Sequence, residues 1–203
     1  MIIISNFIRF TKSIPKSAQY IFLDLEKYYT KSDCLMLDLF EMISYYIIYG
    51  KSFILSNNDN LKLIAYIFEK SLIDDRIYEK SPLLGCSLMN ILLQSYDDIP
   101  FEFVSKVISI AQNHLIQINV TEQVLTVYII TFNKYMALLG IIYSGFLRYS
   151  KVTLEALQND LQNLLEITDI ILKSKFYTIY QARVIFYKLN VGYYFRDLRI
   201  IHV

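Results

Sequence analysis

The stretch that decides the fold is residues 99–115, IPFEFVSKVISIAQNHL. Its apolar residues recur at intervals of three and four, which places them on one side of a helix. Pro100 is expected in the first turn, where the N–H that proline lacks would have no partner. Asp97 and Asp98 precede it at the positive end of the helix dipole. The apolar stripe consists of Phe103, Val104, Val107, Ile108, Ala111 and Leu115.

The same spacing recurs along most of the chain and predicts further helices. Residues 124–132 are rich in β-branched residues, but their helical neighbours favour a helix there too. Only 5 glycines and 3 prolines are present, too few for the frequent turns of a β-sandwich or barrel. A break is expected near Gly140. The further predicted helices are Leu35–Ile48, Asn57–Ile73, Pro82–Tyr96, Leu154–Leu172 and Tyr177–Leu189, with two more on either side of Gly140.

The predicted helices fall into pairs joined by short turns, at a spacing near the period of about 40–47 residues of HEAT and armadillo units. This favours an all-α fold, a right-handed α-solenoid of about four HEAT-like pairs over residues 31–190. Residues 1–30 are expected to be helical, and 191–203 form a tail. An up-and-down helix bundle would use similar helices and stays open as an alternative. The pairs are 35–48 with 57–73, 81–96 with 99–117, 121–138 with 140–149, and 154–172 with 177–190.

Charge and motifs exclude several functions. Basic residues number 20 and acidic residues 19, so no excess of basic charge favours nucleic acid as a partner. Glycine-rich phosphate loops, nucleophile elbows and His-Glu-x-x-His motifs are absent from the sequence. The only histidines, His114 and His202, are far apart, and the acidic pairs Asp74-Asp75 and Asp97-Asp98 fall at predicted helix boundaries. We therefore expect no catalytic residue, no metal site, no cofactor and no enzymatic activity.

Cysteine usage and hydropathy bear on the cellular environment. Cys34 and Cys86 lie in apolar runs and are expected to be buried free thiols, which suits a reducing compartment. Residues 125–147 are apolar and long enough to span a membrane, but Asn133 and Lys134 lie at their centre. A lysine there costs about 2.5–3.5 kcal/mol on insertion, so buried helices are favoured over a membrane span.

Tyrosine is abundant, with 18 Tyr and 13 Phe against no Trp. Tyrosine is enriched at interface hot spots, so one interpretation is an aromatic binding surface. The other is codon bias from an AT-rich genome, since Ile, Lys and Asn are abundant as well. The second interpretation is favoured.

Several segments occur in an order known from one family. They are Asp38-Phe40-Met42 in a helix, residues 53–64 (FILSNNDNLKLI), Ser81-Pro82-Leu83-Leu84 through Ile91-Leu92-Leu93-Gln94, Ile99-Pro100-Phe101 through Leu115, Leu164 to Asp169, and Arg183 to Phe186. Over residues 34–190 this series resembles the C-terminal HEAT-repeat part of a karyopherin-β, in the branch of importins seven and eight.

The resemblance implies a protein-binding scaffold, a fragment of a nuclear transport receptor that carries protein cargo between cytoplasm and nucleus. Cargo and nucleoporins would be its partners, the Ran GTPase site would be missing, and exposed solenoid ends would allow self-association. The second helix of each pair would line the binding surface. A scaffold unrelated to transport and a ligand-binding helical bundle are the alternatives. The candidate protein-binding residues on 99–117 are Glu102, Lys106, Ser109, Gln112 and Asn113.

Overall fold

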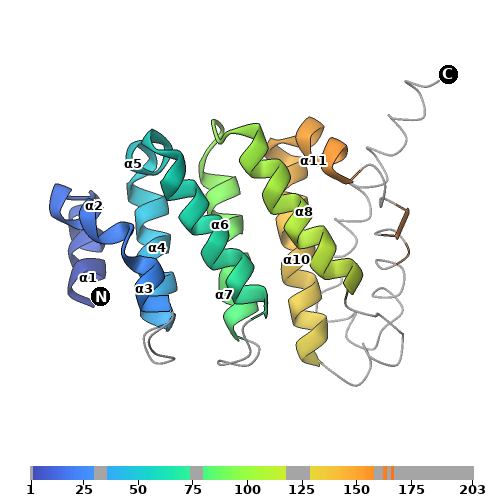
Figure 1. Cartoon of the computed structure of the whole chain (residues 1–203), viewed down its shortest axis with the longest axis horizontal. Coiled ribbons are helices and arrows are strands. Elements are labelled where there is room, and N and C mark those ends of the chain that lie inside the picture. The colour runs from blue at the N-terminus through green and yellow to red at the C-terminus, as the bar shows by residue number, and fades with distance from the viewer. Residues whose placement is uncertain are drawn as a thin grey trace. The chain divides into compact units, whose positions relative to one another are not determined.

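The computed structural model describes residues 2–29, 36–73, 80–117, 129–157, 162–163 and 166. All regular secondary structure in these residues is helical, which confirms the all-α class (Figure 1). The helices are α1 (Ile2–Thr11), α2 (Lys16–Phe22), α3 (Leu25–Tyr29), α4 (Met36–Tyr49), α5 (Lys51–Ser56), α6 (Asn58–Ile73), α7 (Lys80–Ser95), α8 (Phe101–Gln117), α10 (Ile129–Arg148) and α11 (Ser150–Leu157).

The chain divides into two compact units, Met1–Val107 and Ile108–Val203, and the boundary lies inside α8. We call them unit 1 and unit 2 and describe each by itself. The described part of the N-terminal segment, residues 2–29, contains α1, α2 and α3. Both α1 and α3 contact α4, so this segment packs as part of unit 1.

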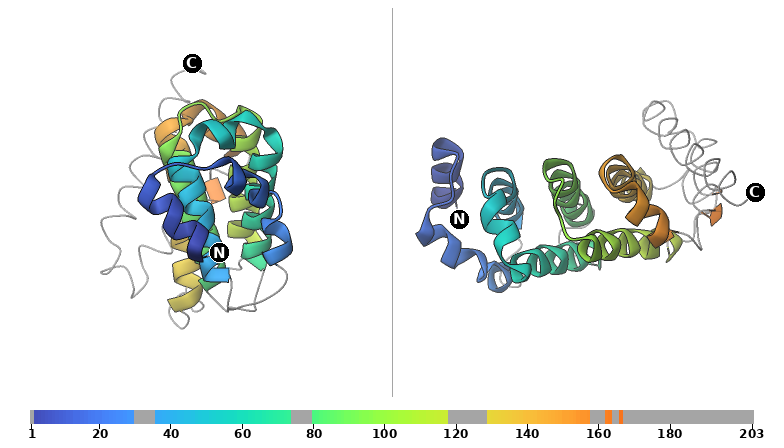
Figure 2. Two further views of the ribbon diagram at one scale, coloured as in Figure 1. Left: turned by 90° about the vertical axis from the view of Figure 1, so that its left-hand side faces the viewer. Right: turned by 90° about the horizontal axis from the view of Figure 1, so that it is seen from above.

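Unit 1 is built from two layers of helices. Helices α1, α4 and α7 lie side by side in one layer, and α3 and α6 lie in the other (Figure 2). Helix α4 is the centre of the unit because it contacts α1, α3, α5 and α7. Its apolar stripe is fully buried as the periodicity predicts, with Leu39, Met42, Ile43, Tyr46 and Ile47 inaccessible to solvent.

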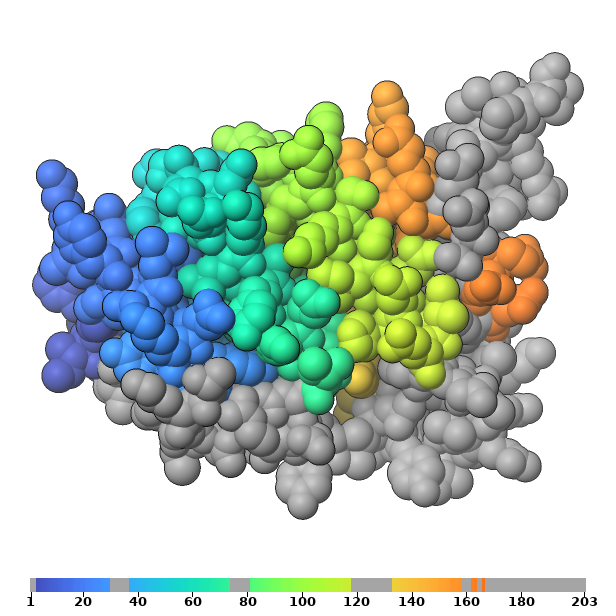
Figure 3. Space-filling model, in the orientation of Figure 1, coloured from blue at the N-terminus to red at the C-terminus, as the bar shows by residue number. Residues whose placement is uncertain are grey.

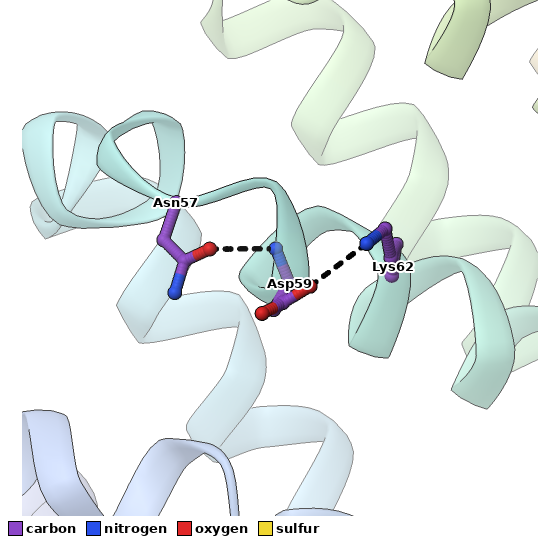
Figure 4. Close-up of polar contacts among 3 residues, drawn as sticks. All are labelled: Asn57, Asp59 and Lys62. Atoms are coloured by element: carbon purple, nitrogen blue, oxygen red, sulfur yellow. Dashed lines mark hydrogen bonds and ion pairs between the residues drawn. The ribbon is translucent and has the colours of Figure 1, made fainter.

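Helix α6 begins with a side-chain cap. The side-chain Oδ1 of Asn57 accepts a hydrogen bond from the backbone N–H of Asp59 at 2.9 Å (Figure 4). This bond satisfies one of the N–H groups that a helix start leaves without a partner. The predicted helix Asn57–Ile73 is confirmed to within one residue, with Asn57 as the capping residue.

The starts of α7 and α8 test the proline predictions. Helix α7 begins at Lys80, so Pro82 lies in its first turn as predicted. Helix α8 begins at Phe101, so placing Pro100 inside its first turn was wrong by one residue. The Pro100 carbonyl accepts hydrogen bonds from the N–H groups of Phe103 and Val104 at 3.0 and 3.2 Å, which makes Pro100 the capping residue.

Unit 2 contains the second half of α8 together with α10 and α11. The prediction of two helices broken near Gly140 was wrong, because α10 runs continuously from Ile129 to Arg148. A glycine inside a helix costs only about 1 kcal/mol, and this helix is held by buried residues on both sides of Gly140. These residues are Leu138, Leu139, Ile141 and Ile142.

Helix α11 begins at Ser150, four residues before the predicted start at Leu154, and Tyr149 alone separates it from α10. Residues 129–132 of the β-branched tract are helical as predicted. Cys86 is buried and forms no disulfide bond, as predicted. Among the described residues no helix is long and apolar enough to cross a membrane.

Some predictions lie outside the described residues. These are Cys34, the Asp74-Asp75 pair, most of the predicted helix Leu154–Leu172, the predicted helix Tyr177–Leu189, His202 and the tail 191–203.

Candidate protein-interaction surface

Helix α8 carries the five residues that the sequence nominated for binding. Glu102, Lys106 and Asn113 are exposed and Ser109 is half-buried. At 100° per residue, these four positions follow one side of the helix. They therefore form the polar outer face that the periodicity predicts.

Gln112 does not belong to that face. Only 5% of its surface is exposed, so its assignment to a solvent-facing surface was wrong. The helical spacing places Gln112 next to Ile108 and beside the stripe that ends at Leu115. The buried arc covers about half of the helix circumference, and Gln112 lies at the edge of this arc.

A second polar surface lies on α3 and α6, which contact each other in unit 1. We call it the α3–α6 face; Figure 3 shows it on the near side of the molecule. Along α6 the exposed residues Lys62, Glu69 and Lys70 surround the half-buried Tyr66. The Lys70 Nζ lies 5.5 Å from the centre of the Tyr66 ring, a cation–π distance. This polar stripe has the same helical spacing as the stripe on α8, which is the signal that would have nominated Tyr66 and Lys70.

Ion pairs between close neighbours lie on α6 and at the start of α3. Lys62 pairs with Asp59 at 2.9 Å in the first turns of α6 (Figure 4). Lys27 pairs with Asp24 at 2.5 Å, and the hydrogen bond that the lysine donates to this carboxylate raises the pKa of the lysine. All four side chains are more than half exposed, so solvent screens these pairs and they add little to folding stability. Their charges are therefore available to a partner.

Three other tyrosines lie in the interior and not on a surface. Tyr46, Tyr96 and Tyr135 are buried, and each donates its hydroxyl to a backbone carbonyl of another helix. Burial raises the pKa of Tyr46 to about 12 and raises the pKa values of the other two as well. Tyr46 donates to the Ala18 carbonyl at 2.7 Å, Tyr96 to the Ile47 carbonyl, and Tyr135 to the Leu115 carbonyl at 2.6 Å.

Two of these acceptors explain why the tyrosines are there. Ile47 and Leu115 belong to the last four residues of α4 and α8, whose carbonyls have no partner within the helix. The buried hydroxyls bond to these carbonyls, so part of the tyrosine excess is structural. Tyr66, half-buried on the α3–α6 face, is a tyrosine that a partner on this face would reach.

Helix α1 carries an exposed apolar stripe. Ile3 and Phe10 are each 85% exposed and Phe7 is 50% exposed. Their spacing of four and then three residues aligns them along one side of the helix. The sequence did not nominate this stripe because residues 1–30 had no assigned partner helix, although the spacing itself is visible at positions 3, 7 and 10.

Acidic and metal-ligating side chains do not gather into a site in the described part of the chain. No three His, Cys, Asp or Glu residues there lie close enough to hold a metal ion. Asp98, which was expected only to precede α8 as a favourable charge, forms an ion pair with Lys51 at the start of α5, 2.9 Å apart.

Comparison of this chain with protein-family models, with curated proteins and with solved structures finds no match. The resemblance to karyopherin-β stays a prediction.

Proposed function

We propose that this chain is a non-enzymatic, protein-binding helical scaffold. The observation that carries the proposal is the α3–α6 face, where Tyr66 lies among exposed charges of both signs. Tyrosine is enriched among the residues that dominate binding energy, and interface rims are polar. The remaining sides of α6 are used for packing, since α6 contacts α3, α5 and α7.

We also propose that the helices form a right-handed solenoid of HEAT-like pairs. The alternation of helices between two layers along unit 1 supports this arrangement. In a solenoid the second helices of successive pairs line one extended surface. Within unit 1, the polar face of α6 and the first half of α8 would then both belong to the binding surface, with Glu102 and Lys106 extending it.

The first experiment asks whether the α3–α6 face binds protein. The purified chain serves as bait for cell extract, and each retained protein is purified and titrated against variants. We expect the double variant Tyr66→Ser/Lys70→Glu to weaken binding about tenfold or more, since hot-spot truncations have effects of this size.

Matched controls place similar changes elsewhere. Tyr20→Ser removes an exposed tyrosine from α2, and Lys151→Glu reverses an exposed charge on α11. Both controls should bind as the wild type does. If nothing is retained specifically, or if the controls weaken binding equally, the proposed surface is wrong.

The resemblance to karyopherin-β supports a narrower proposal. The scaffold would be part of a nuclear transport receptor that moves between cytoplasm and nucleus with protein cargo. Binding of the chain to immobilised phenylalanine–glycine nucleoporin repeats and to nuclear-localised cargo tests it. Retention on either supports transport, whereas a chain that binds other proteins through Tyr66 but neither of these is a scaffold outside transport.

A further inference from the structure

Helix α1 is apolar on two opposite sides. On the inner side, facing α4, Ile8 is completely buried. On the outer side are Ile3, Phe7 and Phe10, and helical spacing places Ile8 about 140° around the axis from Ile3. A helix that is apolar on two sides is built to pack on both. Its neighbour α4 does so, since it packs between α1 and α7 (Figure 2).

We propose that the outer side of α1 binds the same side of α1 in a second copy of this chain, with the two helices antiparallel. The dimer would extend the layer formed by α7, α4 and α1 across a twofold axis. Helix α1 of each copy would then cover the outer stripe of the other copy.

The spacing of the stripe is self-complementary. With a rise of 1.5 Å per residue, Ile3 lies about 6 Å from Phe7 along the axis and Phe10 about 4.5 Å on the other side. An antiparallel copy with its twofold axis at Phe7 places Ile3 of each chain within about 1.5 Å, along the axis, of Phe10 in the other. An interface between identical surfaces needs this kind of match.

Charge and polarity favour a second copy over a lipid surface. Arg9 is the only charged residue of α1, and helical spacing places it about 120° away from the stripe. The stripe is flanked by Asn6 and Thr11, whereas helices that lie on anionic membranes carry Lys and Arg beside the apolar side. No like charges would meet in the antiparallel dimer.

The exposed area sets the expected strength. From their exposed fractions, the three side chains offer roughly 400 Å² of apolar surface, about half of the roughly 800 Å² that each partner buries in a standard interface. A patch of this size matches the largest apolar patch on a typical monomer, which is often functional. We therefore expect a weak, concentration-dependent dimer.

Sedimentation velocity over a wide concentration range tests the dimer. We expect reversible dimerisation of the wild type, weakened about tenfold or more by Phe10→Ser. The matched control is Phe101→Ser, because Phe101 is also an exposed phenylalanine, 68% accessible, but lies on α8. The control should dimerise as the wild type does, and circular dichroism should show both variants equally helical. A wild type that stays monomeric, or equal loss in both variants, would overturn the proposal.

Cysteine cross-linking tests the antiparallel geometry. Under mild oxidation Phe7→Cys should form a disulfide-linked dimer, because this position faces itself across the axis. Phe10→Cys alone should not, since its two copies lie about 9 Å apart along the axis, but an equal mixture with Ile3→Cys should. The wild type gives the background from Cys34 and Cys86. Cross-linking of Phe10→Cys to itself but not to Ile3→Cys, or binding to phosphatidylserine vesicles without dimerisation, would overturn the proposal.

Discussion

The α6–α7 contact of unit 1 and the α10–α11 contact of unit 2 both place a helix glycine against a small hydroxyl residue. A Cβ atom on Gly85 would lie 1.9 Å from the Ser71 Oγ, and one on Gly145 would lie 2.6 Å from the Thr153 Oγ1. The contacts differ in the hydroxyl groups. Ser71 donates a hydrogen bond to the Phe68 carbonyl at 2.6 Å, whereas the buried Thr153 Oγ1 has no partner among the described residues.

The difference separates two requirements that are often met together. Close approach of two helices needs only the missing side chain of glycine, and both contacts have it. A buried hydroxyl also needs a hydrogen-bond partner, because leaving it without one costs about 1–3 kcal/mol. The contact in unit 1 meets both requirements, and the contact in unit 2 meets only the first.

Adding a methyl group at Gly85 should break the unit 1 contact and have the largest effect. Alanine favours a helix over glycine by about 1 kcal/mol, but its Cβ would overlap Ser71, whose own Cβ is only 2.9 Å away. We expect Gly85→Ala to lower the free energy of unfolding by about 2 kcal/mol, measured by urea denaturation.

Ser87→Ala is the control, because Ser87 is exposed on the same helix. It should leave stability within about 0.5 kcal/mol of the wild type. Combining Gly85→Ala with Ser71→Ala should cost less than the sum of the single changes, since the overlapping hydroxyl is removed. Simple additivity would contradict the close contact.

The tyrosine hydroxyls test whether unit 2 lacks polar partners in general. Tyr46 in unit 1 and Tyr135 in unit 2 each donate to a buried carbonyl, so Tyr46→Phe and Tyr135→Phe should each cost about 1.5 kcal/mol. Equal losses would mean that the missing hydrogen bond in unit 2 is limited to the Thr153 hydroxyl. A negligible loss for Tyr135→Phe would mean that the hydrogen bond of a second buried hydroxyl in unit 2 also contributes no stability.

Tyr46 also predicts a pH dependence. Its pKa is about 12 when folded, against about 10 when unfolded, so the neutral phenol contributes stability below pH 10. That contribution is lost as the pH rises from about 10 toward 12. As the pH rises from about 8 to about 11, the free energy of unfolding should therefore fall less for the Tyr46→Phe variant than for the wild type.

The sequence predicted the long helices α4, α6, α7 and α8 well because their signals are local. The stripe of α4 and the cap at Asn57 depend only on residues within a turn or two, so α4, α6, α7 and α8 lie within about two residues of their predicted bounds. The break at Gly140 was wrong for the opposite reason. A glycine breaks a helix only where packing does not hold it, and packing is not a local property.

The candidate surface shows the same limit. Glu102, Lys106, Ser109 and Asn113 follow from helical spacing, whereas the burial of Gln112 depends on what covers the edge of the stripe. The spacing of Ile3, Phe7 and Phe10 is visible in the sequence. Which side of α1 is covered becomes known only when α4 is in place.

Replacing each of the two hydroxyl residues by an apolar residue should test the comparison directly. Thr153→Val replaces the hydroxyl without a partner by a methyl group of similar size, so we expect a gain of about 1 kcal/mol in the free energy of unfolding. Ser71→Ala removes a hydrogen-bonded hydroxyl and should cost up to about 1 kcal/mol. Opposite signs in urea denaturation would support the contrast, and a loss in both would mean that Thr153 has a partner in solution.

The smallest effect on stability is expected at the starts of α6 and α11, the helices that carry the two hydroxyl residues. Asn57 caps α6 through its side chain, whereas the Tyr149 carbonyl accepts the Thr153 N–H at the start of α11, and tyrosine is a poor capping residue. We expect Asn57→Ala to cost about 0.5–1 kcal/mol, since the Asp59 N–H loses its acceptor. Asn58→Ala, one residue along and exposed, is the matched control and should change stability by less than about 0.3 kcal/mol. Equal losses in thermal denaturation would mean that the hydrogen bond from the Asp59 N–H to Asn57 is not what stabilises the start of α6.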